Sequence, residues 1–513
     1  MKEYVISRKG LKIEDMIYIA RNKNVQVSLS SDVLGDVEKS RKFVEKILEK
    51  GKPVYGVNTG FGKFKNITID NKKTCELQEN LIRSHAIGTG EPLSEEIVRA
   101  TILVRAISLS KGYSGIRPIV IKQYLKILNN GIYPYIPSQG SVGCSGDLAP
   151  LSHLALVAMG EGEVIENEKC VPAKKILDKY KIKPIKLAAK EGLALNNGTA
   201  VMTAIAALAV YDAETLVKTA DIAASMSLEV LMGTLTAFHP SIQKIRPYQG
   251  QIDSAYNVRK LCAQSEIIKS HKKCDRVQDS YSLRCVPQVH GAIRESLRHV
   301  REIVEIELNS VTDNPLIFSD EETTRSGGNF HGEPIALVMD YLGIAMADLG
   351  NISERRINKM LDPATNEGLP AFLIPKESAG LSSGYMIAQY TAAALVAENK
   401  VLAHPVSVDS IPTSANQEDH VSFGPIASRK SRKIIEHVTT ILAIELICGA
   451  QAIDFKKPLV PGIGVGTIYQ MVRKVIPFLE KDKVFYPELQ CVTKQVIRRD
   501  FIGTVEKAIG NLR

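Results

Sequence analysis

The segment Gly140–Pro150, with the sequence Gly-Ser-Val-Gly-Cys-Ser-Gly-Asp-Leu-Ala-Pro, contains the residues best suited to unusual chemistry. Gly146 has no side chain to shield its amide nitrogen, and in a compressed turn this nitrogen can reach the carbonyl carbon of Cys144. Closure of a five-membered ring, with loss of one water from Ser145 and a second from the attacked Cys144 carbonyl, would leave a methylidene group conjugated with the ring. Such a group is a strong electrophile, which no ordinary side chain provides.

The same residues are also compatible with less unusual structures. Ser145 or Asp147 can cap the helix that follows an ordinary loop. The Gly-x-Ser-x-Gly elbow of serine hydrolases does not match, because the residue two positions after Ser145 is Asp147. Cys144 and His153 are an alternative pair of thiol nucleophile and base, supported only by one cysteine and a distant histidine.

Long helices are expected to position this segment, because apolar residues recur at helical spacing over much of the chain. One helix is predicted over Ser31–Lys50, and Ser94 can cap a second that ends at Lys111–Gly112. Thr199–Phe238 contains no proline, and a helix of that length would extend about 60 Å at about 1.5 Å per residue. Further long helices are predicted over Gln288–Leu308, Pro334–Leu361, Ser383–His404 and Ser431–Asp454.

These patterns predict a mainly α-helical protein built as a bundle of very long helices with a mixed, smaller N-terminal region. We expect residues 1–198 to form the N-terminal region that carries the Gly140–Pro150 loop, and residues 199–513 to form the long-helix bundle. The long helices are apolar over most of their circumference, which favours burial by neighbouring helices or subunits. Residues with candidate chemistry lie on connections between helices, where a rigid scaffold usually presents a site.

Composition excludes several functional classes. The chain of 513 residues is 44% hydrophobic and 24% charged, as in an ordinary soluble protein, and its formal charge of +9 is spread along the sequence. The densest basic run, Arg429–Lys433, is expected to be a solvated helix start rather than a nucleic-acid patch.

The cysteines and the N-terminus bear on the cellular compartment. Eight cysteines show no metal-type spacing and no dense framework, which is typical of reduced thiols in a cytoplasm, and no metal site is implied. Residues 1–5 have no signal-peptide architecture, and the charge-free apolar stretch near Gly198–Tyr211 is too short to span a bilayer. We therefore expect a soluble cytoplasmic protein without nucleic-acid or membrane partners.

Six motifs occur in a fixed order along the chain: Tyr55–Gly62, Gly140–Leu151, Lys190–Thr199, Gln278–Arg284, Gly328–His331 and Asn416–His420. Together they resemble the histidine ammonia-lyase branch of the aromatic amino acid lyase and aminomutase family, from about residue 50 to the end of the chain. The resemblance implies that Cys144, Ser145 and Gly146 form a 4-methylideneimidazole-5-one group (MIO), with no external cofactor. It also implies a homotetramer whose active sites are shared between subunits.

The activity implied by this resemblance is the non-oxidative deamination of L-histidine to trans-urocanate and ammonia. In the family, the tyrosine at the position of Tyr55 is the base that removes the β-proton, and its pKa must be lowered for that purpose. Helix N-termini that converge on the site can lower this pKa and can also stabilise negative charge on the electrophile.

Substrate contacts are also implied by the resemblance. Arg284 is expected to bind the substrate carboxylate through two parallel hydrogen bonds. Tyr281 and Gln278 line the same pocket in the family, and Asn197 offers amide contacts to a carboxylate or to the MIO carbonyl. Phe330 can pack against the electrophile or the substrate ring.

Two positions indicate histidine as the substrate. Relatives selective for phenylalanine or tyrosine carry leucine at the position of His85, which can instead hydrogen-bond an imidazole ring. They tend toward Asn-Gln-Asp where this chain has Glu418, whose carboxylate can contact imidazole and assist proton transfer. One departure from the family is Cys144, where alanine is usual; its side chain lies outside the ring and does not prevent closure. Alternatives are an MIO-dependent aminomutase, a lyase for another aromatic amino acid, and a catalytically silent helical scaffold.

Overall fold

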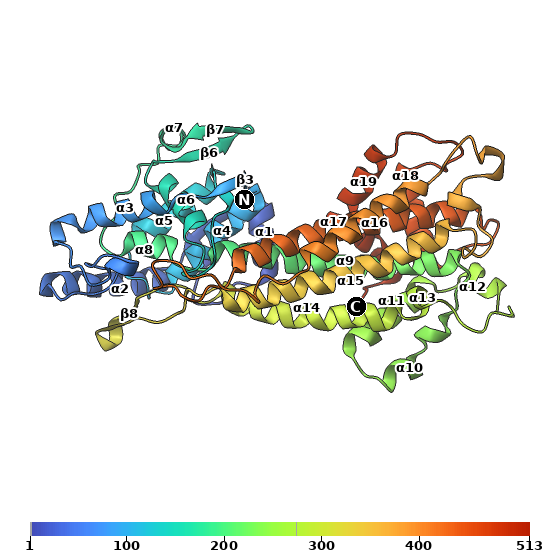
Figure 1. Cartoon of the computed structure of the whole chain (residues 1–513), viewed down its shortest axis with the longest axis horizontal. Coiled ribbons are helices and arrows are strands. Elements are labelled where there is room, and N and C mark those ends of the chain that lie inside the picture. The colour runs from blue at the N-terminus through green and yellow to red at the C-terminus, as the bar shows by residue number, and fades with distance from the viewer. Residues whose placement is uncertain (1–2, 273) are drawn as a thin grey trace. The chain divides into compact units, whose positions relative to one another are not determined.

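The computed structural model describes residues 3–272 and 274–513, and most of them lie in helices (Figure 1). The chain forms two compact units. The first unit comprises Met1–Tyr211, Arg301–Asp340 and Pro405–Arg429, and the second comprises Asp212–Val300, Tyr341–His404 and Lys430–Arg513. Each unit is assembled from segments that are distant in the sequence, whereas the prediction divides the chain only once, after residue 198. The predicted regions 1–198 and 199–513 stay a prediction.

The first unit combines shorter helices with small sheets. β1 (Glu3–Ile6) is parallel to β2 (Gln26–Leu29), and three antiparallel groups follow: β3 (Thr89–Pro92) with β5 (Pro137–Gln139), β4 (Tyr133–Pro134) with β6 (Glu163–Glu166) and β7 (Lys169–Pro172), and β8 (Leu316–Phe318) with β9 (Thr323–Arg325). Its helices are α1 (Ile13–Arg21), α2 (Ser31–Lys50), α3 (Thr74–His85), α4 (Glu95–Ser110), α5 (Pro118–Asn129), α6 (Ala149–Ala158), α7 (Ala173–Lys179) and α8 (Glu191–Asn196).

Helix α4 is the centre of the first unit. Every residue from Ile97 to Ser110 is buried, and the helix packs against α1 and α5. Its two arginines, Arg99 and Arg105, are buried as well, so their guanidinium groups must find acceptors. Arg99 donates to carbonyl oxygens at the ends of α1 and α5, among them Ile19 O at 2.9 Å and Leu128 O at 3.1 Å. These bonds satisfy C-terminal carbonyl groups that a helix leaves without partners.

Four long helices contain residues of both units: α9 (Ala200–Val230), α14 (Val286–Leu308), α15 (Glu333–Leu361) and α17 (Gly424–Asp454). The remaining helices of the second unit are α10 (Pro240–Lys244), α11 (Gln249–Leu261), α12 (Glu266–Ser270), α13 (Tyr281–Arg284), α16 (Met386–Leu402), α18 (Ile463–Val475), α19 (Tyr486–Ile497) and α20 (Asp500–Ile509). The predicted bundle of long helices with a mixed N-terminal region is confirmed.

Buried ions link the helices within the second unit. Glu445 on α17 accepts two hydrogen bonds from Arg356 on α15, at 2.5 and 2.9 Å, and one from Ser227 on α9 at 2.6 Å. Asp221 on α9 accepts from His290 at 2.8 Å and from Arg294 at 2.7 Å, both on α14. Each buried carboxylate is thus paired with a cation or a polar donor, as burial of charge requires.

Two helix boundaries differ from the prediction by more than one turn. The helix predicted over Thr199–Phe238 ends at Val230, because Met232 adopts a left-handed conformation (φ 52°) and Gly233 N bonds back to Leu228 O at 2.7 Å. The helix predicted from Ser431 begins at Gly424. The basic run Arg429–Lys433 therefore lies within α17 and is not a helix start.

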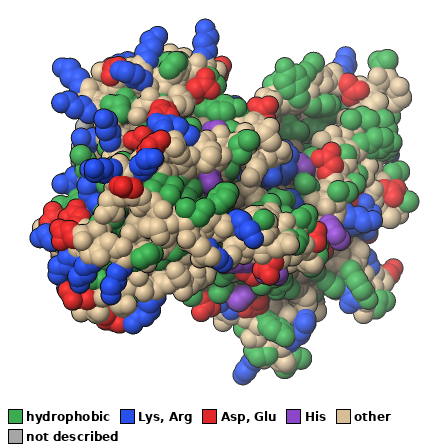
Figure 2. Space-filling view, turned by 60° about the vertical axis from the view of Figure 1, so that its left-hand side comes forward, with side chains coloured by type: hydrophobic (Ala, Val, Ile, Leu, Met, Phe, Trp, Pro, Cys, Tyr) green, Lys and Arg blue, Asp and Glu red, His purple; other side chains and the backbone are tan. Residues whose placement is uncertain are grey.

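Three described helices, α9, α15 and α17, are long and apolar enough by length and composition to cross a membrane. Of their most apolar stretches, 83%, 72% and 89% respectively are buried inside the protein. The charge-free stretch at 198–211 belongs largely to α9, which extends to Val230 and is therefore longer than that stretch. On the face shown in Figure 2, Lys and Arg side chains are intermixed with Asp and Glu.

Candidate active site

The segment that contains Cys144, Ser145 and Gly146 forms a tight loop between β5 and α6. Gly146 has φ +76°, and a Cβ atom there would lie 2.1 Å from the carbonyl oxygen of Gly198. The two glycines form a short parallel bridge, next to which Asp147 N donates to Gly198 O at 2.7 Å. Only glycine fits at position 146, for both steric and conformational reasons.

Asp147 fixes the end of this loop against the start of α9. Its carboxylate accepts hydrogen bonds from Val201 N at 2.5 Å and Met202 N at 3.2 Å, where a helix N-terminus favours a negative charge. Complete burial raises the pKa of Asp147 to about 7, and these two hydrogen bonds oppose that increase. Asp147 therefore caps α9. The ordinary-loop alternative has it cap the helix that follows the loop, which is α6.

The beginnings of α15 and α17 meet the same loop. Gly332 N, just before α15, donates to Gly143 O at 3.3 Å, and Phe423 N, just before α17, donates to Val142 O at 2.8 Å. Together with α6, which begins at Ala149, and α9, four helix N-termini converge on the loop. Their dipoles make the local potential positive, as expected for a site that stabilises negative charge.

The carbonyl oxygen of Ser145 receives two hydrogen bonds from the segment before α9. Asn197 Nδ2 donates at 3.2 Å and Gly198 N at 3.3 Å. The fully buried Arg105 holds this segment through a bond to Asn197 O at 2.8 Å, and it also donates to Thr312 O at 3.0 Å. These donors can stabilise negative charge on the Ser145 oxygen.

Glu418 binds the side chains of the loop directly. Its Oε1 accepts from Ser145 Oγ at 3.0 Å, and its Oε2 accepts from Cys144 Sγ at 2.9 Å and from Thr413 Oγ1 at 3.0 Å. Burial, with the nearby Glu418, raises the pKa of Cys144 to about 12, so the thiol is protonated and donates. His153 instead accepts from Gly88 N at 3.1 Å, so the alternative of a Cys144–His153 pair is wrong.

Two adjoining cavities open beside the loop. One has a volume of about 650 Å³, and its lining includes Tyr55, His85, Ser145, Asn197 and Glu418. The other, of about 480 Å³, shares all of these except His85 and adds Cys144 and Phe330. The structure thus brings together eight of the predicted site residues around one loop: Tyr55, His85, Cys144, Ser145, Gly146, Asn197, Phe330 and Glu418.

Burial changes the titration of two groups at the cavity. It lowers the pKa of His85, which favours the neutral imidazole, and Ser84 Oγ lies 3.0 Å from His85 Nδ1. It raises the pKa of Tyr55, an effect that the charge of Glu418 increases and a hydrogen bond from the Gly62 backbone opposes. This direction is opposite to the lowered pKa that the expected role of Tyr55 as a base requires, so the lowering by helix N-termini stays a prediction.

Three predicted site residues, Gln278, Tyr281 and Arg284, belong to the second unit and line neither cavity. Tyr281 is exposed, and the Arg284 guanidinium lies 4.7 Å from the centre of its ring. Nε of Arg284 is buried and has no hydrogen-bond partner among the described residues. Tyr281 and Arg284 thus form a pair of an aromatic ring and a cation.

Sequence reasoning missed Thr413, which holds Glu418, and Arg105, which holds the Asn197 segment. An arginine within the apolar run Ile102–Ile107 is a signal that could have identified Arg105 as a buried positioning residue. Thr413 gave no comparable signal.

Comparison with known proteins agrees with this architecture. A family model described as aromatic amino acid lyase matches residues 11–474. The chain belongs to the aromatic amino acid lyase family. The predicted family and the enzyme class, a carbon–nitrogen lyase, are confirmed.

Relatives within the aromatic amino acid lyase family match over the whole chain. A histidine ammonia-lyase from Alkaliphilus metalliredigens is 48% identical and covers 100% of both chains. Among solved structures, a histidine ammonia-lyase from Trypanosoma cruzi is 42% identical, with TM-score 0.91 over 99% of this chain and 96% of that one. A tyrosine aminomutase from Streptomyces globisporus is 36% identical, with TM-score 0.93 over 100% of both chains.

Proposed function

We propose that this protein is a histidine ammonia-lyase, which converts L-histidine to trans-urocanate and ammonia. The observation that supports this most directly is the placement of His85 and Glu418 in the cavity that Ser145 also lines. A neutral His85 and the Glu418 carboxylate can each hydrogen-bond an imidazole ring, which an apolar side chain cannot do. Similarity to relatives named histidine ammonia-lyase, at 48% identity over the full chain, supports the same substrate.

The residues of the loop fit the MIO group. Position 146 accommodates only glycine, the Ser145 hydroxyl is present for elimination, and two donors face the Ser145 carbonyl. The group would be formed by Cys144, Ser145 and Gly146 without an external cofactor, and it would supply an electrophile that draws electron density from the substrate. Asn197 Nδ2 and Gly198 N would stabilise negative charge on the Ser145 oxygen through their hydrogen bonds.

Tyr55 is the proposed base. Elimination removes a proton from the β-carbon and the amino group from the α-carbon, and the electrons of the broken C–H bond form the new double bond as ammonia departs. The phenolate of Tyr55 would accept that proton within the same cavity as Ser145. Because burial raises the pKa of Tyr55, the positive potential of the four helix N-termini must favour the phenolate during turnover.

The proposed roles of the remaining predicted residues depend on an assembly of subunits. We propose a homotetramer with shared active sites, in which Arg284 binds the substrate carboxylate of a site and Gln278 and Tyr281 help orient the substrate, while Phe330 packs against its ring. Helix α16 supports an assembly, because Ile387, Tyr390 and Val401 leave large apolar side chains exposed. A cytoplasmic location is proposed, in keeping with eight free cysteines.

The test is near-ultraviolet absorbance of the purified protein with L-histidine, L-tyrosine and L-phenylalanine in parallel. A urocanate band with histidine alone supports the proposal. A cinnamate- or coumarate-type band with another substrate would refute the specificity while retaining the electrophile. Intact mass provides the second measurement, since ring formation removes about 36 Da as two waters; an unmodified mass together with inactivity would indicate a silent scaffold.

One alternative, an MIO-dependent aminomutase, is compatible with the same fold. The tyrosine aminomutase structure matches this chain with TM-score 0.93, so the fold alone does not separate a lyase from an aminomutase. An aminomutase returns ammonia to the β-carbon. Chromatography of the products would therefore decide between them, since a β-amino acid identifies the mutase.

A further inference from the structure

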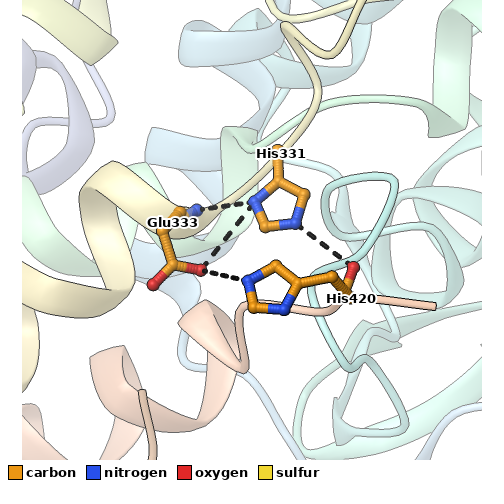
Figure 3. Close-up of side chains that lie close together, drawn as sticks. All are labelled: His331, Glu333 and His420. Atoms are coloured by element: carbon orange, nitrogen blue, oxygen red, sulfur yellow. Dashed lines mark hydrogen bonds and ion pairs between the residues drawn. The ribbon is translucent and has the colours of Figure 1, made fainter. Parts of the chain in front are cut away.

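We infer that His331, Glu333 and His420 form a binding site for a divalent transition-metal ion on the wall of the 480 Å³ cavity. His331 and His420 both line that cavity, together with Glu418. The three side chains face one another in Figure 3, and their candidate ligand atoms all lie within 4.8 Å. The inference goes beyond the proposed deamination and does not depend on which amino acid is the substrate.

The geometry centres on one carboxylate oxygen. Oε2 of Glu333 lies 3.9 Å from Nδ1 of His331 and 3.9 Å from Nε2 of His420. Ligands about 2.0–2.1 Å from a tetrahedral zinc ion are roughly 3.4 Å apart, so each of these two pairs needs to approach by about half an ångström. The two histidine nitrogens lie within 4.8 Å of each other. The two imidazole rings are stacked, with 6° between their planes and 5.7 Å between their centres, and both direct a nitrogen at the same oxygen.

Hydrogen bonds of His331 fix the tautomer that a metal ligand needs. Glu333 N donates to Nδ1 at 3.3 Å, and Nε2 lies 3.4 Å from the carbonyl oxygen of His420. The proton therefore resides on Nε2, and the Nδ1 lone pair is on the edge of the ring that faces Glu333. Metal-bound histidines usually donate their other N–H to a carbonyl or carboxylate in this way. A bound ion would replace the Glu333 N–H as the partner of this lone pair.

The donor set selects a class of ion. Two imidazole nitrogens and one carboxylate oxygen suit Zn²⁺ and Co²⁺, whereas Mg²⁺ and Ca²⁺ prefer sites built of oxygen atoms. Glu333 begins α15 and His331 is two residues earlier, while His420 belongs to the loop before α17. An ion would therefore fasten the loop that carries Glu418 to the first turn of α15, and its remaining coordination positions would hold water at the cavity.

The experiment is a titration of the full-length, metal-stripped protein with Co²⁺, followed by visible absorbance, with equilibrium dialysis of Zn²⁺ as a second readout. Glu333→Gln and His420→Asn are the test variants; His420 is exposed, so its replacement should leave the fold intact. His299→Asn, an exposed histidine on α14, is the matched control. Thermal melting of each variant without metal checks that it is folded.

The expected result is a saturable visible band of nitrogen- and oxygen-ligated Co²⁺, with a single ion bound per chain. Affinity should fall at least about ten-fold in both test variants and stay unchanged in the control. Zn²⁺ should raise the melting temperature of the wild type but not of Glu333→Gln. Absence of saturable binding, unchanged affinity in both test variants, or near-ultraviolet thiolate bands from exposed Cys75, Cys170 or Cys274 would overturn the inference.

Discussion

Replacing Cys144 by alanine should lower kcat/KM about five-fold, because its thiol helps to hold the carboxylate of Glu418. In the unmodified chain this carboxylate has three side-chain donors, namely Ser145 Oγ on Oε1 and Cys144 Sγ and Thr413 Oγ1 on Oε2. Ring formation eliminates the Ser145 hydroxyl. Oε1 then becomes available to a substrate, while Cys144 and Thr413 remain to orient the group.

The magnitude follows from the nature of that bond. A hydrogen bond to a charged group contributes about 1.5–3 kcal/mol, and a thiol is a weak donor, so about 1 kcal/mol is expected. At about 1.4 kcal/mol for each factor of ten, this corresponds to about five-fold. The residue carrying the thiol is buried, so bulk water cannot easily replace the lost donor.

The assay is the initial rate of urocanate formation for Cys144→Ala, Glu418→Gln and the double variant. If the thiol acts through Glu418, Cys144→Ala should have almost no further effect in the Glu418→Gln background. An equal loss in both backgrounds, or no loss in the wild type, would refute the reasoning. Intact mass must show the same extent of ring formation in each variant, and Cys262→Ala, at a buried thiol of the second unit, serves as the matched control.

Four further predictions concern the site and its support. Tyr55→Phe should lower kcat at least about a hundred-fold. Because the pKa of Tyr55 is raised, kcat/KM of the wild type should increase toward alkaline pH, and this increase should be absent from the pH profile of Tyr55→Phe. Gly146→Ala should leave the intact mass unmodified, because the new Cβ would lie 2.1 Å from the Gly198 carbonyl oxygen; a loss of about 36 Da in this variant would contradict the steric argument. His85→Leu should reduce kcat/KM for L-histidine about ten- to hundred-fold through loss of a buried hydrogen bond, as steady-state kinetics would reveal. Asp221→Asn should destabilise the protein by about 3–5 kcal/mol in urea unfolding; since the folded pKa of Asp221 lies below its ordinary value, the wild type gains this stability above about pH 4 and loses it as the pH falls further.

Local features of the sequence were sufficient for the reactive loop and for most helices. The Cys144-Ser145-Gly146 triad and its surrounding glycines are adjacent in sequence, and α2 was predicted with the bounds that the structure has. The start of α17 was missed because Phe423 and Ser422, not an apolar pattern, define where the helix begins: Ser422 Oγ accepts from Gly424 N at 3.1 Å.

Interactions between distant residues could not be predicted in the same way. The pKa of Tyr55 depends on burial and on Glu418, which no property of the Tyr55–Gly62 motif specifies. The contact of Cys144 with Glu418 joins residues far apart in the chain, as does the cluster of His331, Glu333 and His420. Metal-ligand spacing along the sequence is informative only when the ligands share a local segment.

The contacts of the reactive loop have a consequence for how the enzyme matures. The loop is held by segments near residues 198–202, 332 and 422–424, the last of which is synthesised long after the triad itself. In the proposed enzyme, compression of the turn therefore has to wait until these segments have assembled. A nascent or misfolded chain would carry an ordinary cysteine, serine and glycine, harmless to the thiols and amines around it. The electrophile would thus be present only in molecules that have folded at least once. A chain unfolded afterwards would keep the closed ring and the lower mass that results from it.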